Sequence, residues 1–170
     1  MQNSAMTAEV KLSFDKFREA VLNDYKTACI SREASLLGRK EVLTGKAKFG
    51  IFGDGKEVPQ VAMAKFFNPG DFYSGYYRDQ TLAFATGAAT LEEFFAQLYA
   101  DPDTSHDPHS GGRQMNSHFA TPFINEQGEF LDLINRKNLA AGMAPTAAQM
   151  PKSIGLALAS KIFRSVPSLQ

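Results

Sequence analysis

One pattern of apolar residues near the start of the sequence restricts the fold more than any other feature. These residues recur at steps of three and four, which is the spacing of one face of an amphipathic helix. They are Phe14, Phe17, Val21, Tyr25, Ala28 and Cys29. Ser13 is the predicted N-cap, and Gly38 is the residue at which we expect the helix to stop. The pattern predicts one long helix, in which Cys29 is a buried core residue rather than a nucleophile.

Three further segments have helical spacing. Residues 57–67 form the first and residues 91–99 the second. Thr90 and Glu93 predict a capping box ahead of the second helix, because each side chain can bond a backbone N–H that the first turn leaves free. Residues 140–160 are rich in Ala, Gly and Met, and they predict a helix that approaches a neighbour or a ligand closely.

Other segments lack this spacing. Residues 68–71, Asn-Pro-Gly-Asp, predict a turn. Residues 101–117 are rich in Asp, Pro, Ser, Gly and His and predict a long loop. Loops longer than about 12 residues in a compact domain are often functional or mobile. Residues 129–134 predict a strand.

The charge of the chain is balanced. Eighteen basic residues offset eighteen acidic ones among 170, so no net field favours a nucleic acid or a membrane surface as partner. A single cysteine permits no internal disulfide and is typical of a reducing compartment. No apolar run approaches the roughly 20 residues that span a bilayer, and the first residues lack a signal-peptide pattern. We therefore expect a soluble, cytoplasmic protein.

Two glycine-rich segments resemble phosphate-binding motifs, but the residues that follow them do not fit either motif. Residues 50–56 match G-x-x-x-x-G-K, but Glu57 stands where a phosphate-binding loop needs Ser or Thr for magnesium. We interpret this segment as a glycine-rich turn. Residues 53–55, Gly-Asp-Gly, imitate the start of the magnesium-diphosphate motif of thiamin enzymes. The next asparagine, Asn68, follows too closely to leave room for the strand–helix–strand unit that the motif requires.

Two histidines lie close together in the long loop. His106 and His109 are separated by Pro108, which prevents a helical face that would direct both rings at one ion. No cysteine or paired carboxylate completes a zinc shell beside them. We predict that both are solvated loop residues and that the chain has no metal site of its own.

Three segments, in order, resemble one enzyme family. They are residues 55–62, residues 71–79 followed by the capped helix, and residues 112–118 followed by residues 144–151. Over roughly residues 10–165 the chain resembles the alpha chain of thiamin-diphosphate-dependent 2-oxoacid dehydrogenases, the decarboxylating first component. The branched-chain type and the fused alpha–beta form of bacteria are the most similar.

The resemblance implies a fold class and a domain division. The expected fold is α/β, the N-terminal part of a three-layer thiamin-diphosphate-binding domain and helix-rich in this chain. Residues 1–40 are then an N-terminal helical segment, and residues 41–170 are an incomplete cofactor-binding domain.

The resemblance also implies roles for particular residues. Tyr77 and Arg78 match the pair that holds the cofactor's diphosphate, and a guanidinium suits phosphate oxygens because it donates two parallel hydrogen bonds. Ala144 and Thr146 match a turn whose main chain bonds the aminopyrimidine ring. His118 matches a histidine near phosphate and substrate, a catalytic candidate that could donate to an oxyanion. A purely structural histidine remains an alternative.

Activity and partners follow from the same resemblance. The intact enzyme would decarboxylate a 2-oxo acid with thiamin diphosphate and Mg2+, and pass the acyl group to a lipoyl group on a transacylase. A beta chain, or a beta part of the same chain, would be the other partner in an oligomer. The alternatives are another thiamin-dependent enzyme, of the acetoin dehydrogenase or transketolase-like kind, and a non-catalytic helical interaction module.

Two departures from the family pattern limit these expectations. In branched-chain members a potassium ion lies near the turn, held by hydroxyls and a glutamine. Met143 and Ala148 stand at the hydroxyl positions here, and only Gln149 remains, so we expect no potassium site. The family's magnesium motif would follow beyond residue 170. We therefore expect an N-terminal piece that is inactive alone.

Overall fold

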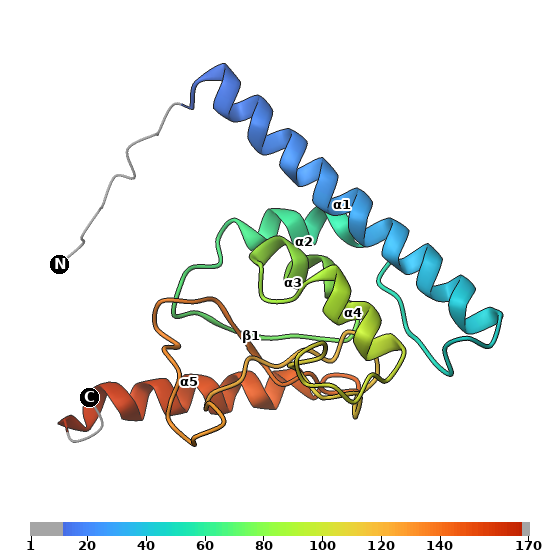
Figure 1. The fold of residues 1–170 in the computed structure, drawn as a ribbon. Coiled ribbons are helices and arrows are strands. Elements are labelled where there is room, and N and C mark those ends of the chain that lie inside the picture. Colours follow the sequence, from blue (N-terminus) through green and yellow to red (C-terminus); the bar gives the residue numbers. More distant parts are fainter. Residues whose placement is uncertain (1–11, 168–170) are drawn as a thin grey trace.

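A computed structural model describes residues 12–167. The helices and strands follow in the order α1 (Phe14–Leu43), α2 (Glu57–Ala64), β1 (Phe72–Ser74), α3 (Gln80–Thr86), α4 (Leu91–Leu98), β2 (Asn138–Ala140) and α5 (Gln149–Ser165). Helices α2, α3 and α4 lie between the long helix α1 and the two strands, and α5 runs along the opposite side of the molecule (Figure 1). The structure is thus helix-rich with a small sheet.

Helix α1 begins as predicted but ends later. The Ser13 hydroxyl accepts a hydrogen bond from the Lys16 N–H at 3.4 Å, which confirms the N-cap. The expected stop at Gly38 is wrong, because this glycine lies inside the helix against the ring of Phe52. A Cβ at residue 38 would lie 2.4 Å from a ring carbon, so the residue serves close packing. The helix ends at Leu43, and the left-handed residue that follows is Gly45.

The apolar stripe of α1 faces solvent. Phe14, Phe17, Val21 and Tyr25 are all exposed, and Phe14 keeps 74% of its surface accessible. The buried residues of this helix are instead small or polar: Ser31, Ala34, Ser35, Gly38 and Glu41. Cys29 is half-buried, so its expected place in the core is only partly realised. Periodicity located a face correctly but did not tell what covers it.

The sheet consists of two parallel strands. Phe72 pairs with Asn138, and Ser74 pairs with Ala140. The strand expected at residues 129–134 is wrong, since this segment contributes only an isolated bridge between Ile124 and Phe130. The strand that forms begins at Asn138, where burial on both faces leaves no alternation to read. Helices with a parallel pair confirm the α/β character within residues 12–167.

The core is centred on Phe94 of α4, which is fully buried. Its ring contacts those of Phe52, Phe84 and Phe95 at centroid distances of 6.4, 5.9 and 5.2 Å. The predicted capping box is confirmed at the start of α4. The Thr90 hydroxyl accepts from the Glu93 N–H at 3.1 Å, and the Glu93 carboxylate accepts from the Thr90 N–H at 2.7 Å.

Helix α3 was not predicted from the sequence, and a polar interface holds it against α1. The Gln80 side-chain N–H donates to the Ser31 carbonyl and to the Ser35 hydroxyl, at 3.0 and 2.9 Å. The hydroxyls of Ser31 and Thr81 lie 2.6 Å apart. All of these side chains are buried. Polar residues at an interface remove the apolar period that identifies a helix.

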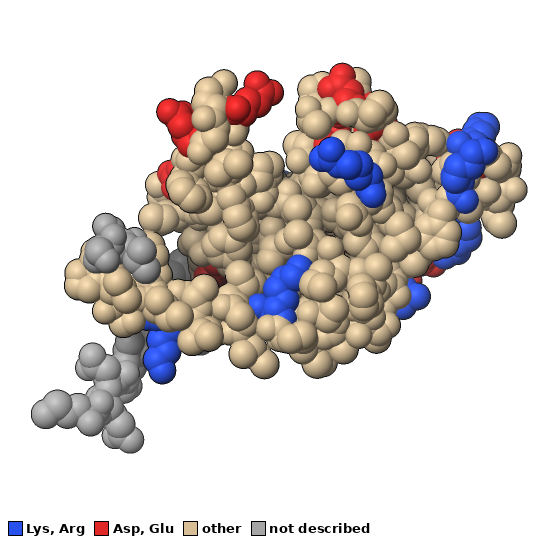
Figure 2. All heavy atoms as spheres, turned by 90° about the horizontal axis from the view of Figure 1, so that it is seen from below, with Lys and Arg blue, Asp and Glu red and all other residues tan. Residues whose placement is uncertain are grey.

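Helix α5 confirms the helix predicted in residues 140–160, although it starts only at Gln149. Of its described residues none is buried, and Ile154, Leu158 and Ile162 are exposed along it. Seen from the side on which α5 lies, the surface is mainly uncharged (Figure 2). None of the helices in residues 12–167 is both long enough and apolar enough to span a membrane.

Candidate functional site

The two parallel strands end side by side, and each is followed by one of the segments expected to hold the cofactor. Residues 75–79 follow β1, and residues 141–148 follow β2. The Ser74 hydroxyl donates to the Gln149 carbonyl at 3.1 Å and links the two segments. In parallel α/β sheets ligands bind at this edge, because the loops that leave the strands converge there. The topology therefore places a candidate site at residues 75–79 and 141–149.

Tyr77, Arg78 and His118 form one stack at this edge. The His118 ring lies 6.0 Å from the Tyr77 ring, at an interplanar angle of 13°. The Arg78 guanidinium carbon lies 5.2 Å from the centre of the Tyr77 ring. Among residues 12–167 no carboxylate lies within ion-pair distance of Arg78. The guanidinium is thus positioned by an aromatic face and free to bind an anion.

His118 is buried and fixed by its backbone. Gln97 accepts from the His118 N–H at 3.0 Å and donates to the His118 carbonyl at 3.1 Å. A Cβ at Gly142 would lie 2.9 Å from the His118 Cα, so the chain after β2 packs directly on this residue. The imidazole Nε2 is buried without a hydrogen-bond partner in the described chain. A buried polar atom without a partner costs stability, which is a reason to expect a ligand or water there.

The loop at residues 101–117 is an ordered platform for His118. Asp107 is fully buried, and its carboxylate accepts from the Ser110 hydroxyl at 2.6 Å and from the Gly112 N–H at 2.9 Å. The Asn116 side chain accepts from the Ile51 N–H at 3.0 Å. The Asp107 bonds close the loop on itself and the Asn116 bond attaches it to the segment before α2, so its polar composition serves internal hydrogen bonding.

The two loop histidines have different environments. His106 is exposed beside Asp101, as predicted, and that carboxylate raises the pKa of the imidazole. The prediction is wrong for His109, whose side chain is only 4% exposed. Its ring packs edge-on against Phe119 and contacts Glu93 at 3.3 Å. Residues 12–167 contain no group of three or more His, Cys, Asp or Glu that could hold a metal ion.

Two residues that sequence analysis did not select hold the backbone of Arg78. The buried Gln60 of α2 donates to the Arg78 carbonyl at 2.9 Å and accepts from the Leu82 N–H at 3.0 Å. Gly53 lies on the other side of the same carbonyl, where a Cβ would come within 2.5 Å of the oxygen. This glycine is therefore required for close approach to the site.

The glycine-rich turn contains no free phosphate site. The carboxylate of Glu57 accepts from the Gly55 N–H at 3.0 Å and pairs with both arms of Arg32, at 2.7 and 3.0 Å. The pairing with Arg32 lowers the pKa of Glu57 to about 2, so the helix start is already occupied by an anion. Asp54 pairs with Arg39 at 2.6 Å. The interpretation of residues 50–56 as a turn is confirmed.

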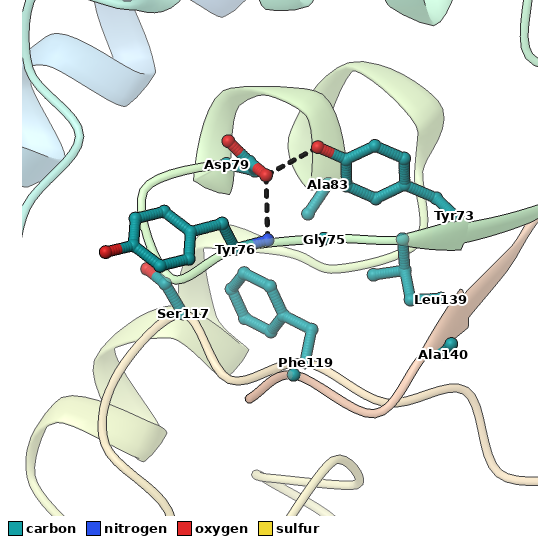
Figure 3. Close-up of a pocket in the computed structure, with 10 residues that line it drawn as sticks. Tyr73, Gly75, Tyr76, Asp79, Ala83, Ser117, Phe119, Leu139 and Ala140 are labelled. Atoms are coloured by element: carbon teal, nitrogen blue, oxygen red, sulfur yellow. Dashed lines mark hydrogen bonds between the residues drawn. The ribbon is translucent and has the colours of Figure 1, made fainter. Parts of the chain in front are cut away.

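A small cavity lies at the segment after β1 (Figure 3). Hydrogen bonds between the residues that line it fix this segment. The cavity volume of about 20 Å³ holds one water molecule, so a cofactor ring would lie outside it. Asp79 accepts from the Tyr73 hydroxyl at 2.5 Å and from the Tyr76 N–H at 2.8 Å. Burial and this carboxylate raise the pKa of Tyr73. Ser117, in a left-handed conformation (φ 62°), lines the cavity with a buried hydroxyl that has no partner in the described chain.

Tyr76, which the sequence did not single out, touches two of the predicted cofactor residues. Its hydroxyl is in hydrogen-bond contact with that of Tyr77, and the rings lie 3.8 Å apart. Hydrogen bonds with Tyr77 and then Thr146 lower the pKa of Tyr76. The pKa of Tyr77 is raised, mainly by its bond to Tyr76. An extra tyrosine beside the predicted pair was the available sequence signal.

The turn after β2 exposes its main chain. Ala144 and Thr146 are both exposed, and Ala147 adopts a positive φ of 67° in the same turn. Neither the Ala144 carbonyl nor the Thr146 N–H has a backbone partner within residues 12–167. The Gln149 side-chain oxygen is buried without a partner in that range, and Met143 and Ala148 have no side-chain oxygen.

Two comparisons relate the sequence of this chain to known proteins. Residues 25–165 match the sequence profile of the family described as "Dehydrogenase E1 component". The chain belongs to this family. It is also similar to the 2-oxoisovalerate dehydrogenase subunit alpha of Bacillus subtilis (strain 168), with 29% identity over 143 residues. The aligned part covers 81% of this chain and 37% of that relative, so the chain spans well under half of the relative's length.

Proposed function

We propose that this chain supplies the diphosphate-anchoring part of a thiamin-diphosphate-dependent 2-oxoacid dehydrogenase first component. The observation that carries the proposal is the convergence of Tyr77, Arg78 and His118 with the turn at residues 144–146, at the ends of two parallel strands. Family membership and the similarity to a 2-oxoisovalerate dehydrogenase subunit favour a branched-chain 2-oxo acid as substrate.

The donor set fits a diphosphate. Within residues 12–167 no carboxylate pairs with Arg78 and the buried Nε2 of His118 has no partner, while Tyr77 brings a phenol. Charge-assisted bonds from a guanidinium to phosphate oxygens are about twice as strong as neutral ones. The exposed main chain at Ala144 and Thr146 would bond the aminopyrimidine ring and set its orientation.

Each residue then has a physical task. Arg78 holds phosphate oxygens, while Gln60 and Gly53 fix the backbone from which it projects. The His118 Nδ1 donates to the Asn116 carbonyl at 3.3 Å, so Nε2 would donate to phosphate or to an oxyanion from the imidazolium form. Bound thiamin diphosphate would supply the carbanion chemistry by which a 2-oxo acid loses carbon dioxide, and the chain would supply orientation.

The proposal extends to partners. A beta chain or beta part would complete the site, a lipoyl-bearing transacylase would accept the acyl group, and the assembly would be an oligomer in the cytoplasm. Mg2+ would neutralise the diphosphate through ligands outside these residues. We propose that the chain shows no turnover alone. The three-layer architecture, and the division into residues 1–40 and 41–170, also remain predictions.

Arg78→Ala tests the cofactor role. We expect the affinity of the complete enzyme for thiamin diphosphate to fall by about tenfold to a hundredfold, because a hydrogen-bonded charge contributes about 1.5–3 kcal/mol. Isothermal titration calorimetry measures it, with Arg18→Ala as the matched control because this arginine is exposed on α1, away from the site. Unchanged affinity would favour the non-catalytic helical module. Product formation with and without a lipoyl acceptor separates the acetoin-type and transketolase-like alternatives.

A further inference from the structure

Tyr76 lies between the two segments that the proposed function assigns to the cofactor. Tyr77 belongs to the segment after β1, and Thr146 belongs to the turn after β2. The Tyr76 hydroxyl contacts that of Tyr77, and a side-chain hydrogen bond with Thr146 is the second cause that lowers the pKa of Tyr76. Its backbone N–H donates to Asp79 at 2.8 Å, which fixes the side chain at its base. Tyr76 is thus a connection between residues that lie far apart in the sequence.

We propose that Thr146, Tyr76 and Tyr77 form a chain of hydroxyls, in which Tyr76 is a positioning residue that directs the Tyr77 phenol toward the diphosphate. The inference rests on the proposed function. In this series of hydroxyls, Thr146 donates to Tyr76, Tyr76 donates to Tyr77, and Tyr77 donates to a phosphate oxygen. Successive hydrogen bonds polarise one another, so the terminal donor becomes stronger.

The surroundings of the two phenols favour this direction. The Tyr76 hydroxyl donates to the Tyr77 oxygen, so the Tyr77 proton takes no part in the bond between the two phenols. The Tyr77 ring contacts two neighbouring rings, since Tyr76 lies 3.8 Å away and His118 lies 6.0 Å away. Because the Tyr77 oxygen already accepts from Tyr76, the Tyr77 hydroxyl can donate its own proton to a ligand.

A double-mutant cycle between residues 76 and 77 tests the proposal in the complete enzyme, freed of cofactor. We expect Tyr76→Phe, which keeps the ring and removes the hydroxyl, to weaken thiamin diphosphate binding about three- to tenfold. Tyr77→Phe should weaken it about tenfold or more. Because Tyr76 acts through Tyr77, the double variant should bind no more weakly than Tyr77→Phe alone. Inorganic pyrophosphate, titrated separately, should show the same order of affinities.

Two further variants keep the test decisive. Tyr99→Phe is the matched control, since this phenol contacts Glu41 at 2.8 Å, away from the site, and it should leave the affinity unchanged. If Tyr76→Phe does not fold, Thr146→Val replaces it in the cycle, with an expected loss of about twofold.

The outcomes distinguish a failure of the hydroxyl chain from a failure of the cofactor site on which it depends. Additive losses at residues 76 and 77, or normal binding by Tyr76→Phe beside weak binding by Tyr77→Phe, would overturn the hydroxyl chain and leave the cofactor site in place. Normal binding by both Tyr77→Phe and Arg78→Ala would overturn the cofactor site itself. A loss of affinity for thiamin diphosphate without a loss of affinity for pyrophosphate would also contradict the hydroxyl chain, because its terminal donor binds a phosphate oxygen.

Discussion

The body around Phe94 and the two long helices use apolar residues in opposite ways. In the body, aromatic rings from α3 and α4 and from the segment before α2 pack together, and Phe94 is completely buried. In α5 and the first half of α1, the regularly spaced apolar residues are exposed, and Ile154 keeps 72% of its surface accessible. Both regions show clear helical periodicity.

The difference teaches that periodicity defines a face and that only packing partners decide its burial. The site belongs to the body, where Gln60, Gln97 and Asp107 fix it through buried hydrogen bonds. Helix α1 contacts that body through small or polar residues such as Ala34 and Gly38. Stability should therefore depend strongly on the body and weakly on the exposed stripes.

The largest expected effect is that of Phe94→Ala. Removing a fully buried aromatic side chain leaves a cavity and should lower the free energy of unfolding by about 3–5 kcal/mol. Urea denaturation followed by circular dichroism measures it. Phe94→Leu, which keeps most of the volume, should cost clearly less. If Phe94→Ala cost under about 1 kcal/mol, the body would not be the stable region.

An intermediate effect is expected at the junction between α1 and α2, where Arg32 pairs with Glu57. The pKa of Glu57 is lowered to about 2, so the stabilisation is complete above its unfolded value of 4.5 and is lost as pH falls toward 2. Glu57→Gln should cost about 1–2 kcal/mol at pH 7 and remove that part of the acid dependence. Urea denaturation, repeated at intervals of about one pH unit between pH 2 and pH 7, measures both the loss at pH 7 and the acid dependence.

A matched control for this junction is Asp54→Asn, because the pair of Asp54 with Arg39 is more exposed. It should cost less than about 1 kcal/mol. Equal losses for Glu57→Gln and Asp54→Asn would mean that burial at this junction contributes nothing.

The smallest effect is expected for Phe17→Ser on the exposed stripe of α1. The side chain keeps more than half of its surface accessible, so the change should alter the free energy of unfolding by about 0.5 kcal/mol or less. Leu158→Ser on α5 should behave alike. A loss comparable with that of Phe94→Ala would show that the stripe is covered in solution and would end the contrast between the regions.

Local signals in the sequence predicted the elements that local physics fixes. The capping box at Thr90 and Glu93, the N-cap at Ser13 and the turn near Pro69 all follow from bonds between near neighbours. Helix α3 was missed because polar residues face α1, and β2 was missed because all three of its residues are buried. The stop at Gly38 was misplaced because its role lies in a contact with Phe52.

In the candidate site, too, some residues could be selected from the sequence and others only from the structure. Resemblance to a family selected Tyr77, Arg78, His118, Ala144 and Thr146, and the structure brings the first three together beside the turn that holds the others. Their roles remain predictions. The motifs that contain Gly53 and Gln60 did not indicate this role, because their contacts to the Arg78 carbonyl cross from one segment to another. Such contacts become visible only in three dimensions.

The pairing of β1 with β2 has a consequence for when this site can exist. Closing a long loop costs entropy before the contacts at its ends form, and parallel pairing between distant segments is correspondingly slow. Tyr77 and Thr146 meet only after that closure. During synthesis the chain must leave the ribosome as far as α5 before the candidate site can assemble. The site should therefore form last, after helices α1 and α4.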